Sequence, residues 1–150
     1  MVYPNILAVH NILRWVVLIL GLIAVCRAWL GWLGKKDWKM TDRRIGVFFT
    51  SAMDAQMLFG LLLYFFFSDI VRGAFQDFSA AMSNHGLRFF ALEHVFYMVL
   101  AIVFSHLGSI LPKRVQDSLA KYKLAAAFLT MALLFILLGM PWSRPLLPGF

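Results

Sequence analysis

Four long apolar runs dominate the pattern of hydrophobic and polar positions along the chain. They cover residues 6–33, 45–67, 87–111 and 124–140. Each is long enough to cross the roughly 30 Å hydrocarbon core of a bilayer at about 1.5 Å of helix per residue. Polar residues do not recur along them at helical spacing, as they would on the solvated face of a soluble helix. The pattern predicts an all-α integral membrane protein, with residues 1–150 forming one domain, an up-and-down bundle of four transmembrane helices.

The segment between the second and third runs is too polar to span a membrane, yet it repeats apolar residues at helical spacing. These residues are Val71, Phe75, Phe78 and Met82, and they lie opposite Arg72, Gln76 and Asp77. We predict a short amphipathic helix at the outer interface, the alternative being a loop with scattered aromatic residues. After the fourth run, Pro141 and Trp142 end the helix, and the tail to Phe150 is predicted to be an extended arm.

Composition supports a membrane protein, because 62% hydrophobic and 14% charged residues do not describe a soluble domain. The net charge of +7 is concentrated in the first and third connections. The basic residues there are Lys35, Lys36, Lys39, Arg43, Arg44, Lys113, Arg114, Lys121 and Lys123. By the positive-inside rule these connections face the cytoplasm, and both termini and the middle connection face outward. We therefore expect anionic lipid headgroups, and not nucleic acid, as the partners of these charges.

The first apolar run carries one stripe of polar and small residues. At about 100° per residue, His10, Arg14, Val17, Gly21 and Ala28 share a narrow face of the helix. Small residues let a neighbouring helix or a flat cofactor approach closely, so this stripe is predicted to face the interior of the bundle. The alternative for Arg14 is that its side chain extends outward to the interface.

Two histidines, His10 and His94, lie in the outer third of the predicted membrane region on different helices. His10 is about one turn into its run and His94 about two turns into its own. Neutral imidazoles facing each other across a bundle can hold a b-type haem, and the nearby cations Arg14 and Arg88 could neutralise its propionates. The chain has no CxxCH, which excludes covalent haem attachment. The alternative is that the two histidines only hydrogen-bond neighbouring helices.

Three further ionisable residues lie within the runs. His106 follows His94 by twelve residues, which leaves the two rings about 120° apart around the helix, so a second stacked haem is not predicted. We interpret His106 as a packing or hydrogen-bonding residue. Asp54 is predicted to lie inside the bundle, either protonated or paired with Arg14. Glu93 could orient a ligand, relay protons with Asp54 or pair with an arginine, and pairing is the simplest interpretation.

Several short motifs together resemble a known family. They are His10-x-x-Leu-Arg-Trp15, Gln56-x-x-x-Gly-Leu-x-Leu-Tyr64-Phe, Arg88-Phe-Phe-Ala-Leu-Glu-His94, Pro112-Lys-Arg and Pro141-Trp142. The set is similar to small four-span bacterial membrane proteins labelled cytochrome b or cytochrome-b-like, over nearly the whole chain. The resemblance implies a haem-binding electron-transfer subunit in the bacterial inner membrane. The chain departs from the family pattern at Asp54, where relatives tend to carry a histidine.

The leading hypothesis is a small haem-b electron-transfer subunit of a respiratory or photosynthetic complex, with His10 and His94 as ligands of the iron near the outer face. Without HExxH or GxSxG, such a chain would not be a catalyst on its own. The alternative is a cofactor-free accessory subunit that packs on a larger membrane complex through its almost featureless fourth helix. A third hypothesis is a proton-conducting or transport protein that uses Asp54 and Glu93.

Overall fold

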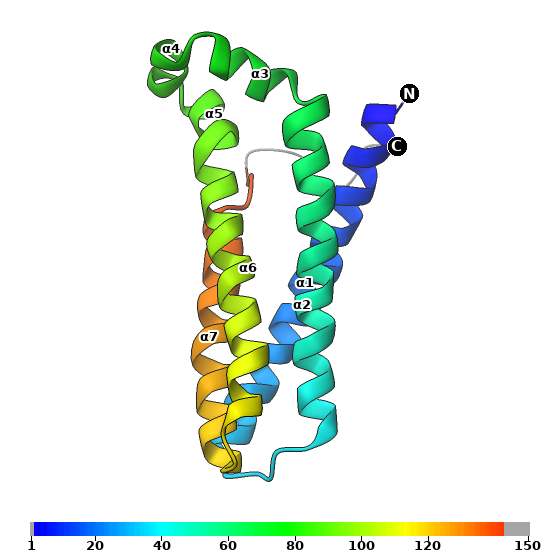
Figure 1. The fold of residues 1–150 in the computed structure, drawn as a ribbon, viewed down its shortest axis with the longest axis vertical. Coiled ribbons are helices and arrows are strands. Elements are labelled where there is room, and N and C mark those ends of the chain that lie inside the picture. The colour runs from blue at the N-terminus through cyan, green and yellow to red at the C-terminus, as the bar shows by residue number, and fades with distance from the viewer. Residues whose placement is uncertain (1, 143–150) are drawn as a thin grey trace.

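The computed structural model describes residues 2–142, and the predicted arm at 143–150 lies outside this part of the chain. Within it, four helical stretches are long and apolar enough to cross a membrane: Val2–Leu33, Met40–Phe67, His85–Arg114 and Ser118–Leu138. The elements described are all helices, and the chain passes up and down through them (Figure 1). The predicted all-α, four-helix membrane bundle is therefore confirmed.

Two of the four spans change helical type along their length. The second consists of α2 (Met40–Leu62) and the π-helical turn η1 (Leu63–Phe67). The third consists of α5 (His85–Arg88), η2 (Phe89–Glu93), α6 (His94–Ile110) and η3 (Leu111–Arg114). The first span is α1 (Val2–Leu33) and the fourth is α7 (Ser118–Leu138). Because π-helical turns add a residue per turn, η1 and η2 change which side chains face the interior beyond them.

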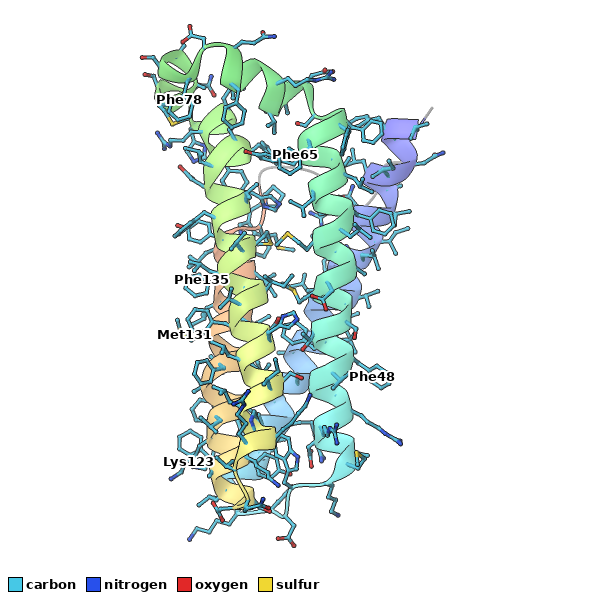
Figure 2. The ribbon with its side chains drawn as sticks, in the orientation of Figure 1. Phe48, Phe65, Phe78, Lys123, Met131 and Phe135 are labelled. Carbon is cyan, nitrogen blue, oxygen red and sulfur yellow. The ribbon has the colours of Figure 1, made fainter. Side chains whose placement is uncertain are left out.

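The four spans form a closed ring. The helix α1 packs against α2 and α7, and α6 packs against α7 and α2. Figure 1 shows α3 (Asp69–Gln76) and α4 (Phe78–Ser83) lying across one end of the bundle, between α2 and α5. Lys123 lies near the opposite end, whereas Phe65 and Phe78 lie near α3 and α4 (Figure 2). The first and third connections, which carry most of the basic residues, join the helices at the Lys123 end. We call these ends the basic end and the α3–α4 end.

The predicted amphipathic segment forms two short helices. The hydroxyl of Ser68 accepts a hydrogen bond from the Val71 amide at the start of α3, and Asp77 caps α4 in the same way through the Ala80 amide. Asp77 breaks the helix because its backbone leaves the helical region. Val71 is buried beneath α3, whereas Phe75 is 54% exposed. The apolar side chains of the segment therefore do not all pack on the bundle: some are buried beneath α3 and others are exposed.

Small residues let the helices approach closely in the core. The predicted stripe on α1 is confirmed, because Arg14, Val17, Gly21 and Ala28 are all buried. A Cβ atom added at Gly31, farther along the same face, would overlap the ring of Tyr122 on α7. This close approach of α1 and α7 therefore requires a glycine at position 31.

A buried carboxylate holds the basic end together. The side chain of Asp42, in the first turn of α2, accepts hydrogen bonds from Arg27 on α1 at 2.6 Å and from the Tyr122 hydroxyl at 2.8 Å. It also accepts one from the Lys39 amide at 2.9 Å. A charge buried in this way is stable only when it is paired and fully hydrogen-bonded. Asp42 therefore ties three of the four spans together.

Candidate functional site

A cavity of about 370 Å³ lies in the half of the bundle next to the α3–α4 end. Residues of all four spans line it, among them His10, Gln56, His94 and Ile136. Its volume is within the range of about 300–1,000 Å³ that is typical of small-molecule and cofactor sites. Since both predicted histidines line this one cavity, the structure brings together the two residues that sequence spacing had paired.

The two imidazoles lie at similar depths. The helix α1 begins at Val2, several residues before the predicted start, so His10 lies about two turns from its end. His94 likewise lies about two and a half turns from the start of α5 at His85. The predicted offset of one turn came from the helix boundaries inferred from hydrophobicity. It disappears because both helices extend beyond their apolar runs.

His10 is held against α2 by two residues of that helix. The amide nitrogen of Gln56 lies 3.2 Å from His10 Nε2. With the amide donating, Nε2 accepts and the proton of the neutral ring is on Nδ1. The ring also lies over Gly60, where a Cβ atom would come within 3.2 Å of His10 Cε1. Gln56 and Gly60 are one helical turn apart, so a single face of α2 provides both the hydrogen bond and the space for the ring.

Two buried polar atoms at this position have no hydrogen-bond partner among the described residues. They are His10 Nδ1 and Gln56 Oε1. Unpaired buried polar atoms are rare in folded proteins, since each costs about 1–3 kcal/mol. Their presence in the lining of a cavity is what a site completed by a bound molecule would show.

His94 is oriented by the C-terminal end of α7. Its Nδ1 donates a hydrogen bond of 2.6 Å to the carbonyl oxygen of Gly139, the residue that follows α7. The rings of Phe89 and Phe90 lie 5.9 and 6.3 Å from the imidazole, centre to centre. Histidines that bind metals usually donate their second N–H in this way, which fixes both tautomer and ring orientation. The arrangement leaves Nε2 of His94 as the nitrogen with a free lone pair.

The two predicted arginines have different positions. Arg14 is 8% exposed and lines the cavity, and it donates a hydrogen bond of 2.8 Å to Asn11. Because Asn11 lies one turn closer to the start of α1, the Arg14 guanidinium extends toward the α3–α4 end while staying buried. Arg88 is not part of the cavity lining, and it pairs with Glu93 at 2.6 Å and bonds the Met82 carbonyl. The interpretation of Glu93 as the partner of an arginine is confirmed, and Arg88 is correspondingly engaged outside the cavity.

The prediction for Asp54 was wrong. Its side chain is 53% exposed, and its ion-pair partner is His106 at 3.5 Å, not Arg14. The interior face of α2 passes through Phe49 and Met53, and the next residue is turned by about 100° toward the edge of the bundle. His106 hydrogen-bonds the Ile102 carbonyl through Nδ1, so its predicted hydrogen-bonding role is confirmed. Asp54 and Glu93 thus have separate partners, which does not favour a proton relay between them.

Sequence reasoning missed the methionines of the cavity. Met53, Met57, Met98 and Met140 all contribute to its lining. Thioether side chains are flexible and polarisable, so they adapt to irregular surfaces and to flat aromatic ligands. The one signal available was the spacing of Met53 and Met57, which places them one turn apart on the face that carries Gln56. Among the described residues there is no group of three or more histidine, cysteine or acidic side chains that could hold a metal ion.

No family model, curated protein or solved structure matches this chain. The resemblance to cytochrome-b-like proteins therefore stays a prediction. The interpretation of the cavity rests on its own geometry.

Proposed function

We propose that this protein is a small membrane electron-transfer subunit that holds one b-type haem in the cavity between His10 and His94. The observation that carries the proposal is that two imidazoles from different helices line the same cavity at similar depth. A haem bound there would supply one-electron transfer, and the protein would tune its potential through the axial ligands and burial.

The residues of the cavity fit such a group. His94 presents Nε2 while Gly139 orients its ring. His10 has an unpartnered Nδ1, and its Nε2 becomes available if the Gln56 amide turns away. Arg14 is the cation in the lining that could face a propionate, whereas Arg88 is engaged by Glu93. The mostly apolar lining favours a hydrophobic macrocycle.

The distribution of charge supports an orientation for the site. Lys35, Lys36, Lys113 and Arg114 lie in the connections at the basic end, which would face the cytoplasm of a bacterial inner membrane. The cavity would then lie in the outer half of the bilayer, beneath α3 and α4, with both termini outside. A complex that exchanges electrons near the outer surface is the partner that such a subunit fits.

One observation favours a second candidate, a cofactor-free accessory subunit. The Gln56 amide already hydrogen-bonds His10, and Arg88 already pairs with Glu93. Polar side chains that satisfy one another across helices specify packing without any ligand. In that case the protein would be colourless and would purify with fixed partner subunits.

The decisive experiment is a reduced-minus-oxidised optical spectrum of the purified protein, produced with an adequate haem supply. The proposal predicts b-type bands that are lost in His10→Ala and in His94→Ala. His106→Ala is the matched control, because His106 lies outside the cavity and should leave the bands unchanged. Circular dichroism of each variant shows whether it is folded. A folded, colourless wild-type protein would remove the proposal.

A further inference from the structure

An acid and a base meet on one outer face of the bundle, between α2 and α6. Asp54 Oδ1 lies 3.5 Å from His106 Nε2, and the two side chains are 53% and 41% exposed. Exposed apolar residues lie on the same side of the two helices, Leu58 and Leu61 of α2 and Val99 and Val103 of α6. We call Asp54, His106 and these four apolar residues the α2–α6 face. The exposed Ser51 lies one turn from Asp54, beside this face.

The pair lies deep in the membrane. About 15 Å of helix separates Asp54 from Arg44, which is half of the roughly 30 Å hydrocarbon thickness. Ionisable side chains at this depth face protein or water, because contact with lipid costs several kcal/mol. Mutual pairing reduces this cost, but it leaves both groups about half exposed on a largely apolar surface. The α2–α6 face is therefore incomplete in an isolated copy.

We propose that the α2–α6 face binds the same face of a second copy of this chain. Identical copies insert with one orientation, set by the basic end, so a two-fold axis between them runs along the membrane normal. Residues at one depth in one copy then meet residues at that depth in the other. Since Asp54 and His106 are already at the same depth, the axis brings Asp54 of each copy toward His106 of the other. The face is self-complementary in charge, as an interface with two-fold symmetry requires.

The apolar residues of the face are consistent with this arrangement. Leu58 is 59% exposed and Val103 47% exposed, and both lie about one turn from the pair toward the α3–α4 end, so each copy offers apolar side chains that pack beside it. Neither residue lines the cavity of His10 and His94. Leu61 of the face also lines that cavity, but Asp54, His106, Leu58 and Val103 do not, so the pairing proposed here does not require bound haem.

Complementary variants test the pairing between copies. A chain with Asp54→Leu keeps only the base, and a chain with His106→Leu keeps only the acid. Neither variant can form the pair alone or with itself, whereas one of each restores a single intermolecular pair. Leucine at either position suits the membrane, so both variants should fold. When the two are co-expressed with different tags and reconstituted in vesicles, the mixed dimer should exceed the statistical expectation by about three- to twentyfold, the range for interhelical polar pairs.

Cysteine cross-linking tests the location of the interface. In a Cys26→Ala background, a chain with Leu58→Cys and a chain with Val103→Cys should form a disulfide-linked mixed dimer in vesicles. Leu22→Cys on α1 with Leu134→Cys on α7 is the matched control, because both residues are exposed on other faces and should not cross-link. A wild-type chain that stays monomeric in vesicles, or mixed dimers at only the statistical level, would overturn the proposal, whether the face then meets lipid or an unrelated subunit.

Discussion

Nδ1 of His94 lies 2.6 Å from the carbonyl oxygen of Gly139, so the imidazole on α6 caps the end of α7. This bond joins α6 to the end of α7 beside the cavity. Because it uses Nδ1, it leaves Nε2 as the nitrogen with a free lone pair. A single side chain thus combines a structural contact with the geometry of a ligand. Substitutions that keep the first property and remove the second distinguish the two roles.

His94→Asn is such a substitution. The asparagine amide can donate to the Gly139 carbonyl, but it cannot replace the imidazole as an iron ligand. We expect the haem bands to disappear while the thermal midpoint stays close to that of the haem-free wild type, because bound haem itself stabilises the folded state. His94→Leu loses the bond as well and should destabilise the protein by about 0.5–1.5 kcal/mol. Optical spectra and thermal unfolding in detergent measure the two effects, and haem bands that persist in His94→Asn would exclude His94 as a ligand.

Gly60→Leu should displace the His10 ring, because even a Cβ atom at this position would come within 3.2 Å of it. If His10 is an axial ligand, haem affinity should fall by roughly 10–100-fold, the usual effect of disturbing residues that orient a ligand. The readout is a haem titration of the apoprotein. Gly73→Ala on α3 is the control, since nothing lies within 4 Å of its Cβ position. Equal affinities for the two variants would contradict a role for the His10 ring position.

Asp42→Ala should destabilise the basic end strongly. It removes a buried acceptor that serves Arg27, Tyr122 and the Lys39 amide. We expect a loss of about 2–4 kcal/mol in the free energy of unfolding. Tyr122→Phe, which removes one hydrogen bond, should cost about 1 kcal/mol, and Arg27→Ala less, because Arg27 is 43% exposed. Equilibrium unfolding in mixed micelles measures the loss of unfolding free energy in each variant. A smaller loss for Asp42→Ala than for Tyr122→Phe or Arg27→Ala would show that Asp42 is not the centre of the network.

Gly31→Ala tests the close approach of α1 and α7. Because the new methyl group would overlap the Tyr122 ring, the helices must separate, at a cost of about 1–3 kcal/mol. Gly46→Ala on α2 is the matched control at the same end of the bundle, where the nearest atom to the new Cβ is 3.9 Å away. The control should be neutral or slightly stabilising, because alanine favours helix. Thermal unfolding compares the pair, and similar midpoints would mean that the α1–α7 contact tolerates added volume.

The sequence by itself determined the four spans, the interior stripe of α1 and the placement of His10 and His94 in the same part of the bundle. These are local properties, because the length of an apolar run must match the bilayer and a few polar and small residues mark one face of a helix. Helix between the second and third spans was also predictable, since enough polar residues occur there for helical spacing to be visible. The sequence predicted one helix, however, and the break at Asp77 that divides it into α3 and α4 was not foreseen.

Only the tertiary structure decided how α2 and α6 are rotated about their axes. In a helix that is apolar on all sides, hydrophobicity does not distinguish the face toward lipid from the face toward protein. Asp54 is therefore on the outer edge beside His106, although its depth suggested the interior. For the same reason, the sequence did not reveal the hydrogen-bond partners of the two cavity histidines, Gln56 for His10 and the Gly139 carbonyl for His94. These contacts join residues on different helices, and only the packing of the bundle brings them together.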